Sequence, residues 1–115
     1  MHSPLCDMAD IPDPGAKGFI VERGGERIKV FVVRRDGEVF AYVDSCPHLG
    51  VPLALDEDAY LDLDKSHILC ANHAARFHID DGLCVWGPCA GRSLEPYPVI
   101  VRNGGLYAQG ASPIA

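Results

Sequence analysis

Two pairs of cysteine and histidine are the residues best suited to chemistry in this chain: Cys46 with His48, and Cys70 with His73. Two thiolates and two imidazoles can together hold a metal centre. In one type of 2Fe-2S centre, two histidines on one iron replace two of the usual four thiolates, so the set needed is two Cys and two His. Each segment offers one of each, so neither completes the site alone. The spacing predicts two turns that face each other across a 2Fe-2S cluster.

A structural zinc site is the alternative, because two Cys and two His also form a common tetrahedral zinc set. Zinc fingers usually keep like ligands together, with two Cys on one element and two His on another. This chain instead mixes Cys and His within each pair. The mixed order favours iron and sulfide over zinc.

The segments that must position these turns have the composition of short strands. β-branched and aromatic runs separated by turn residues predict a series of hairpins. The expected strands are 19–21, 28–33, 39–43, 67–70, 76–79, 83–86, 99–101 and 106–108, with turns at Asp36-Gly37, Asp81-Gly82 and 103–105. Nine prolines and twelve glycines argue against long helices, although 59–63 could form one helical turn. The prediction is an all-β fold of antiparallel sheets: one domain, 1–115, with a small inserted cluster-binding subdomain at about 45–90.

Four motifs extend the pattern beyond the four side chains: C-P-H-L-G at 46–50, C-A-N-H-A-A-R-F-H-I-D-D-G at 70–82, W-G-P-C at 86–89 and L-E-P-Y-P-V at 94–99. Together they resemble the Rieske 2Fe-2S ferredoxin family, of the ferredoxin and oxygenase type rather than the cytochrome bc type, over about 18–108. The resemblance implies a small all-β protein that carries single electrons to an oxygenase. By motif position it implies Cys46, His48, Cys70 and His73 as ligands, with Gly87-Pro88 in the turn that covers the cluster.

Departures from the respiratory members of that family concern the cluster's surroundings. Those proteins carry one further Cys in each ligand loop, where this chain has Val51 and Asn72, so the loop disulfide cannot form. They also place a Ser and a Tyr where this chain has Ala75 and Phe77, which cannot donate hydrogen bonds. Two lost hydrogen bonds to charged groups amount to about 3–6 kcal/mol, or about 130–250 mV for one electron. A potential near the low end of the Rieske range, roughly −150 mV upward, is therefore expected.

Composition limits the partners and the location. The chain has 115 residues and a formal net charge of −6, which favours basic docking surfaces on protein partners and disfavours nucleic acid. No apolar run approaches the roughly 20 residues of a membrane span, and 1–10 lacks the basic start and apolar core of a secretory signal. We expect a soluble cytoplasmic carrier between a ferredoxin reductase and an oxygenase component. No facial triad for mononuclear iron is present, so no substrate site of its own is expected; a small subunit of a larger oxidoreductase, such as nitrite reductase, is the alternative.

The remaining residues receive plainer interpretations. The acidic stretch 56–64 is expected to be a surface insertion, either solvated or used in docking. Cys84 and Cys89 flank the 86–88 turn and could be close, but two buried thiols are favoured over a bond, and Cys6 is assigned no role. His67 and His78 are not expected to be ligands. Trp86 and Phe77 are expected to be core residues.

Overall fold

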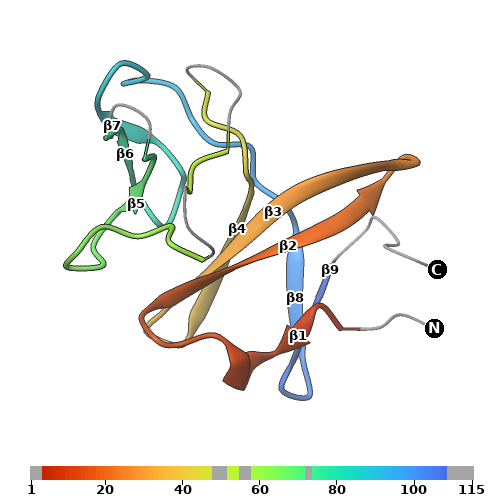
Figure 1. Cartoon of the computed structure of the whole chain (residues 1–115). Helices are drawn as coiled ribbons and strands as arrows, with labels where there is room; N and C mark the ends of the chain where they lie inside the picture. The colour runs from red at the N-terminus through yellow and green to blue at the C-terminus, as the bar shows by residue number, and fades with distance from the viewer. Residues whose placement is uncertain (1–3, 48–51, 55–57, 72–73, 109–115) are drawn as a thin grey trace.

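The computed structural model describes residues 4–47, 52–54, 58–71 and 74–108, and these ranges contain strands, turns and one 3-10 helix but no α-helix. Figure 1 shows their arrangement. The elements are β1 (Cys6–Asp7), η1 (Met8–Asp10), β2 (Gly15–Arg23), β3 (Glu26–Arg35), β4 (Glu38–Val43), β5 (Ile68–Leu69), β6 (Arg76–Phe77), β7 (Cys84–Trp86), β8 (Val99–Arg102) and β9 (Gly105–Ala108). They form three antiparallel sheets of three strands each, in the orders β2-β3-β4, β1-β9-β8 and β5-β6-β7. The predicted all-β class is confirmed.

The hairpins β2-β3, β3-β4 and β8-β9 close with two-residue turns in which both central residues have positive φ. These turn residues are Gly24-Gly25, Asp36-Gly37 and Asn103-Gly104. Turns of this kind match the right-handed twist of the strands, and Gly, Asn and Asp tolerate the left-handed backbone best. The predictions at Asp36 and Asn103 are therefore confirmed, and the local chemistry explains them.

Strand β3 lies between the two hydrophobic cores of the molecule. Phe31 and Val33 pack in the core that also contains the buried cysteines, while Val30 and Val32 pack in the other core, with residues of β1, β8 and β9. All four side chains have 0% exposure. Because successive side chains of a strand point to opposite faces, a continuous apolar run is what a strand covered on both faces requires.

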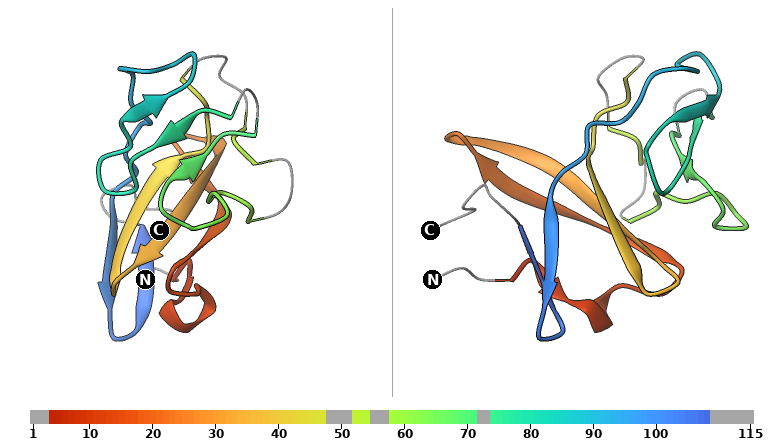
Figure 2. Two further views of the ribbon diagram at one scale, coloured as in Figure 1. Left: turned by 90° about the vertical axis from the view of Figure 1, so that its left-hand side faces the viewer. Right: turned by 180° about the vertical axis from the view of Figure 1, so that it is seen from behind.

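The β5-β6-β7 sheet is small and lies at one end of the molecule, away from β8 and β9 (Figures 1 and 2). Its strands pair Ile68 with Phe77 and Leu69 with Arg76, and a register shift follows between β6 and β7. Strands of two or three residues bury little area by themselves. This sheet therefore depends on the core that it shares with β3 and β4.

Two expectations were wrong. Residues 59–63 form no helical turn: Leu61 pairs with Ile68 as an isolated bridge, and the amide of Leu69 donates to the carbonyl of Tyr60 at 2.9 Å. Phe77 is a core residue, but Trp86 is 56% exposed. Across the register shift, Phe77 pairs with Cys84 and Arg76 pairs with Trp86, so Trp86 lies on the exposed face beside Arg76, whose Cζ atom is 6.0 Å from the centroid of the indole ring.

Within the described ranges, no helix is long and apolar enough to cross a membrane.

Candidate functional site

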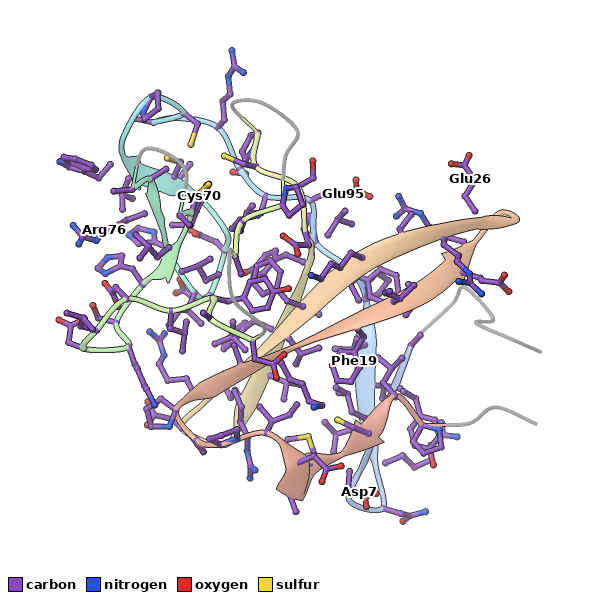
Figure 3. The ribbon with its side chains drawn as sticks, in the orientation of Figure 1. Asp7, Phe19, Glu26, Cys70, Arg76 and Glu95 are labelled. Atoms are coloured by element: carbon purple, nitrogen blue, oxygen red, sulfur yellow. The ribbon has the colours of Figure 1, made fainter. Side chains whose placement is uncertain are left out.

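The two predicted cysteine ligands lie at the ends of strands that enter the same core. Cys46 follows β4 and is 2% exposed, and Cys70 follows β5 and is 0% exposed. Both belong to one cluster of buried side chains, and Figure 3 shows Cys70 where sulfur atoms gather between the small sheet and the neighbouring segments. The structure thus brings the two thiols into one buried region. His48 and His73, the predicted histidine ligands, lie outside the described residues, as do Val51 and Asn72.

A buried carboxylate supports the segment that carries Cys46. The side chain of Asp44 has 0% exposure; one oxygen accepts from the amide of Leu53 at 2.7 Å, and the other accepts from the hydroxyl of Tyr60 at 2.9 Å. Lys29 Nζ lies 3.7 Å from the same carboxylate. Burial first, and then the hydrogen bond to Asp44, raise the pKa of Tyr60 well above its ordinary value. Asp44 therefore joins the two ends of the first ligand segment, because Asp44 precedes Cys46 and Leu53 follows it by seven residues.

The segment that carries Cys70 is a tight turn. The amide of Cys70 donates to the carbonyl of Ala75 at 2.8 Å, and the amide of Ala71 donates to the carbonyl of Leu53 at 2.7 Å. The second contact joins the two ligand segments directly. Ala74 has a φ of 54°, a left-handed conformation that glycine adopts more easily than alanine. The turn accepts that strain where a glycine would avoid it.

The turn after β7 packs against this second segment. A Cβ atom added to Gly87 would lie 2.9 Å from the Cα of Ala75, so the two backbones meet with no room for a side chain. Gly87 also has a φ of 110°, which only glycine adopts readily. Arg92, beyond the turn, donates to the carbonyl of Pro47 at 3.1 Å. Gly87 thus lies against the second ligand segment, and Arg92 contacts the first. Because the sequence predicts that this turn covers the cluster, we name residues 86–88 the covering turn.

Two more buried thiols lie at the base of the covering turn. Cys84 and Cys89 are 2% and 1% exposed, and their Sγ atoms are 2.9 Å apart. Burial, followed by the hydrogen bond with Cys84 and the nearby Cys46, raises the pKa of Cys89 to about 12. The expectation that both thiols are buried is confirmed, and the structure places the two sulfur atoms in direct contact.

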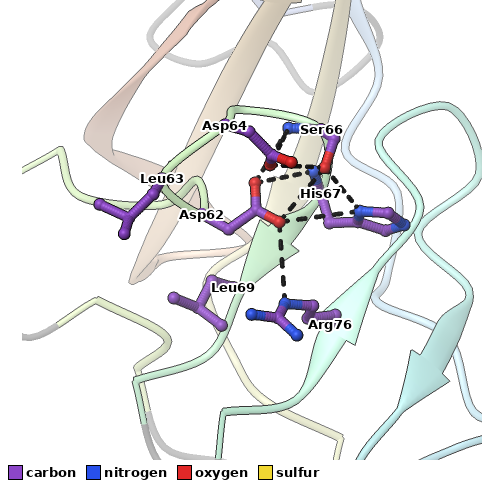
Figure 4. A pocket seen from close by; sticks show the side chains of 7 residues that line it. All are labelled: Asp62, Leu63, Asp64, Ser66, His67, Leu69 and Arg76. Atoms are coloured by element: carbon purple, nitrogen blue, oxygen red, sulfur yellow. Dashed lines mark hydrogen bonds and ion pairs between the residues drawn. The ribbon is translucent and has the colours of Figure 1, made fainter.

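The acidic insertion lies at the surface, as expected, and its backbone is held by hydrogen bonds to its own acids. In Figure 4 the carboxylate of Asp62 lies between Ser66, His67 and Arg76. It accepts from the amides of Ser66 and His67 at 2.9 and 3.1 Å, and it lies 3.7 Å from Arg76 Nε. Four residues earlier in the chain, Asp58 accepts from the amide of Gly18 at 2.8 Å, which joins the insertion to β2. These acids are occupied in holding the loop, while Asp56 and Glu57 lie outside the described residues.

His67 and His78 lie on the outer side of the small sheet, with rings 6.1 Å apart. Their side chains are 35% and 44% exposed, and each faces a carboxylate, Asp62 at 3.7 Å and Asp81 at 3.3 Å. His78, Asp80 and Asp81 present side-chain atoms close enough together to hold an ion, but two of the three are exposed. Their environments are those of surface histidines beside acids.

The donor set fits an iron-sulfur cluster. Thiol sulfurs from two different segments enter one buried region, the two segments are hydrogen-bonded to each other, and a glycine turn closes over the second one. A closed zinc site would need the same thiols, so this geometry alone does not separate the two metals. The comparison with known proteins decides between them.

The chain matches the family described as the Rieske [2Fe-2S] domain over residues 2–102. It belongs to the Rieske family. Since this family carries a 2Fe-2S cluster, the predicted cofactor and the predicted family are both confirmed, and the zinc alternative is set aside. The match includes both ligand segments, the insertion and the covering turn.

Relatives place this Rieske protein closer to ferredoxins than to respiratory subunits. It is 31% identical over 103 residues to the 3-phenylpropionate/cinnamic acid dioxygenase ferredoxin subunit of Photorhabdus laumondii, covering 90% of this chain and 89% of that protein. It is 32% identical over 99 residues to the cytochrome bc1 complex Rieske iron-sulfur subunit of Mycobacterium tuberculosis, but spans only 20% of that longer protein. Mutual coverage of nearly the whole length confirms the ferredoxin type.

A solved structure agrees with the fold. The Sphingomonas yanoikuyae B1 ferredoxin superposes with a TM-score of 0.68 at 26% identity, covering 94% of this chain and 97% of that one. Antiparallel sheets with a small added cluster sheet are therefore shared with a ferredoxin of similar size.

Sequence reasoning missed Asp44 and Tyr60, which support the first ligand segment. Asp44 stands two residues before Cys46, but an acid at that place has no motif of its own. Tyr60 lies inside the stretch 56–64, which the sequence predicts to be a surface insertion, yet it is 1% exposed. The one available signal was the aromatic residue itself, since tyrosine in an otherwise acidic loop tends to be buried by its ring.

Proposed function

We propose that this Rieske protein is a one-electron carrier that takes electrons from a reductase and passes them to an oxygenase component. The observation that carries the proposal is the match, across nearly the whole of both chains, to the ferredoxin subunit of a dioxygenase. That relative has the size of one carrier domain, and this chain has the same size. We further propose that 1–115 is a single domain and that about 45–90 is its cluster-binding subdomain.

Cys46, His48, Cys70 and His73 are the proposed ligands. The buried positions of Cys46 and Cys70 in one core support this assignment for the cysteines. The mixed Cys and His pairs of the sequence support it for the histidines, because a Rieske centre needs two of each. When bound, the cluster supplies reversible one-electron chemistry; the protein's own part is to bind it, exclude water from the sulfur side and present one end to a partner.

The surroundings of the thiols suit that part. Cys46 and Cys70 have almost no contact with solvent, which favours the neutral oxidised centre and makes the added electron costly. Ala75 and Phe77, 1% and 0% exposed, present no hydrogen-bond donor on their side chains. A low potential within the Rieske range follows, and a low potential is what a carrier that reduces an oxygenase requires.

The partner surface is proposed to lie around the covering turn. Trp86 and Val85 are 56% and 41% exposed there, next to the segments that carry the ligands. Exposed aromatic side chains are common at the centres of protein interfaces. With a net charge of −6 the carrier would be steered to basic surfaces on a reductase and an oxygenase. A cytoplasmic location is part of this proposal, since both partners would be met there.

Electron transfer can be measured directly. The holoprotein, reduced anaerobically with dithionite and freed of excess reductant, is mixed in a stopped-flow instrument with oxidised Rieske oxygenase components from aromatic-acid pathways. The proposal expects the carrier's visible absorption to return as the oxygenase is reduced. Failure to exchange electrons with any oxygenase component or reductase would remove the proposal. Copurification with a large subunit of another oxidoreductase would favour the subunit alternative instead.

The ligand assignment has its own experiment. His73→Ala should abolish the visible and electron paramagnetic resonance spectra of the native centre. His67→Ala is the matched control, because His67 lies near the second ligand segment but on its exposed side. An unchanged spectrum in His73→Ala would show that another residue is the ligand.

A further inference from the structure

The strongest feature that electron transfer leaves unused is the pair of thiols at the base of the covering turn. Cys84 and Cys89 lie on opposite sides of the turn, with Sγ atoms 2.9 Å apart. That separation is shorter than the sum of two sulfur van der Waals radii, so nothing lies between the two atoms. We propose that Cys84 and Cys89 are a reversible thiol and disulfide pair, oxidised by a peroxide and reduced by a dithiol.

The backbone on both sides of the pair is held by hydrogen bonds. The amide of Cys84 donates to the carbonyl of Arg92 at 2.8 Å, and the amide of Gly91 donates to the carbonyl of Cys84 at 3.1 Å. The amide of Arg92 donates to the carbonyl of Cys89 at 2.9 Å. A disulfide bond is about 2.05 Å long, so the two sulfur atoms, already 2.9 Å apart, need to approach by only about 0.9 Å.

The chemistry balances with a peroxide as the oxidant. One sulfur attacks a peroxide oxygen and becomes a sulfenic acid, with release of one water; the second sulfur then attacks the first and releases another water. Two S–H bonds and one O–O bond break, and one S–S bond forms. The two sulfurs lose two electrons in total, which the peroxide oxygens gain. A neighbouring thiol at this distance captures the sulfenic acid before further oxidation.

Burial sets the rate of the reaction. Both thiols are almost fully covered, whereas Val85 and Trp86 directly above them are exposed. An oxidant reaches the sulfurs when the covering turn opens, so the reaction is slower than that of an exposed thiol.

Oxidation would tie the two ends of the covering turn together. Gly87, between the cysteines, lies against Ala75 of the second ligand segment. A cross-link across the turn therefore acts on the element that closes over the cluster. The pair is placed where a thiol oxidant can alter how firmly the cluster is covered, whatever partner receives the electron.

The test counts free thiols in the wild-type holoprotein. The protein is reduced, freed of reductant, treated with hydrogen peroxide until no further change occurs, and quenched with catalase. It is then denatured in iodoacetamide and digested with trypsin. Residues 77–92 form one tryptic peptide that contains Cys84 and Cys89 and no other cysteine. Before peroxide we expect two labels on this peptide. After peroxide we expect no label and a mass two hydrogens below that of the unlabelled dithiol peptide. After dithiothreitol we expect two labels again.

The other cysteines provide the internal controls, because Cys6, Cys46 and Cys70 fall on separate tryptic peptides. Visible absorption, recorded through the treatment, reports that the cluster is intact. In Cys84→Ser and in Cys89→Ser, the remaining cysteine of the peptide should either take one label or be oxidised to an oxygen adduct. Neither variant should show the cross-linked mass.

Two results would overturn the proposal. One is a 77–92 peptide that keeps both labels while Cys6, half-buried at the other end of the molecule, is oxidised. The other is a cross-link that appears only after the absorption is lost and joins Cys89 to Cys46, since that bond would report cluster breakdown. Both readings come from the wild-type protein and do not depend on whether a variant folds.

Discussion

The hydroxyl of Tyr60 offers the sharpest test of how the first ligand segment is held. Tyr60→Phe removes only the hydroxyl that donates to Asp44 at 2.9 Å, and it keeps the ring that stacks on Phe31 with centroids 4.4 Å apart and planes 6° apart. The buried carboxylate of Asp44 would then retain the amide of Leu53 and the more distant Lys29. The change removes one hydrogen bond to a charged group and leaves packing unchanged.

The expected loss follows from that single contact. A hydrogen bond to a charged group contributes about 1.5–3 kcal/mol, and the side chain of Asp44 has no solvent contact to compensate. For a domain of this length, 1 kcal/mol shifts the unfolding midpoint by about 3–6 °C. Tyr60→Phe should therefore lower the midpoint by about 5–15 °C. Because Asp44 joins both ends of the first ligand segment, the cluster should also be lost faster to an iron chelator, by about tenfold for each 1.4 kcal/mol.

Tyr97→Phe is the matched control. Tyr97 is likewise buried, at 3% exposure, but its hydroxyl makes no hydrogen bond within the described part of the chain, and it packs in the core on the far side of β3. Removal of a buried hydroxyl that has no partner should leave the midpoint unchanged or raise it. Melting followed by circular dichroism at one scan rate, and chelator loss followed at a visible wavelength, give the two readings. Equal midpoints for wild type and Tyr60→Phe, or equal losses for the two variants, would refute the role assigned to Asp44.

Three further predictions concern the turn, the potential and the pH range. Ala74→Gly should raise the melting midpoint, because relief of about 1–2 kcal/mol of backbone strain at a φ of 54° exceeds the conformational entropy that glycine adds to the unfolded chain. A lower midpoint would contradict this prediction. Voltammetry should place the reduction potential of the wild type well below +150 mV. Ala75→Ser, which supplies a hydrogen-bond donor, should raise that potential by about 65–130 mV. The control Ala90→Ser, at an exposed position, should leave it unchanged. Burial first, and then nearby acids, raise the pKa of Tyr42 to about 12. The contribution of neutral Tyr42 to the folding free energy is therefore complete below pH 10, and about 3 kcal/mol of it is lost as the pH rises to 12. Tyr42→Phe should flatten the fall in melting midpoint over that range, and parallel curves for wild type and variant would contradict this prediction.

Local chemistry explains which parts of the fold were predictable from the sequence. The Asp36-Gly37 and Asn103-Gly104 turns carry their conformation in their own residues, and the apolar run of β3 shows its burial directly. The positions of Cys46 and Cys70 in one core also followed from their spacing. The four-ligand assignment stays a prediction, because His48 and His73 lie outside the described residues.

Contacts between distant residues explain what was missed. The bond between Asp44 and Tyr60 joins positions 16 residues apart, and neither neighbourhood contains a pattern that announces it. The acids of the insertion indicate a surface loop by their charge, but charge alone does not show that Asp62 and Asp58 accept backbone hydrogen bonds that fold the loop. Trp86 is a core residue by type, yet the register shift between β6 and β7 pairs it with the exposed Arg76, and a shift of this kind has no signal in the sequence.

The two faces of β3 differ in whether a change on them reaches the surroundings of the cluster. Phe31 and Val33 face the core that contains all four buried cysteines, while Val30 and Val32 face a core that contains none of them. A cavity on the second face weakens the domain without altering what surrounds the thiols, whereas one beneath Phe31 reaches Tyr60 and, through Asp44, the first ligand segment. A change on the face of Phe31 can therefore alter both the stability of the domain and the surroundings of the thiols, whereas a change on the face of Val30 alters the stability alone.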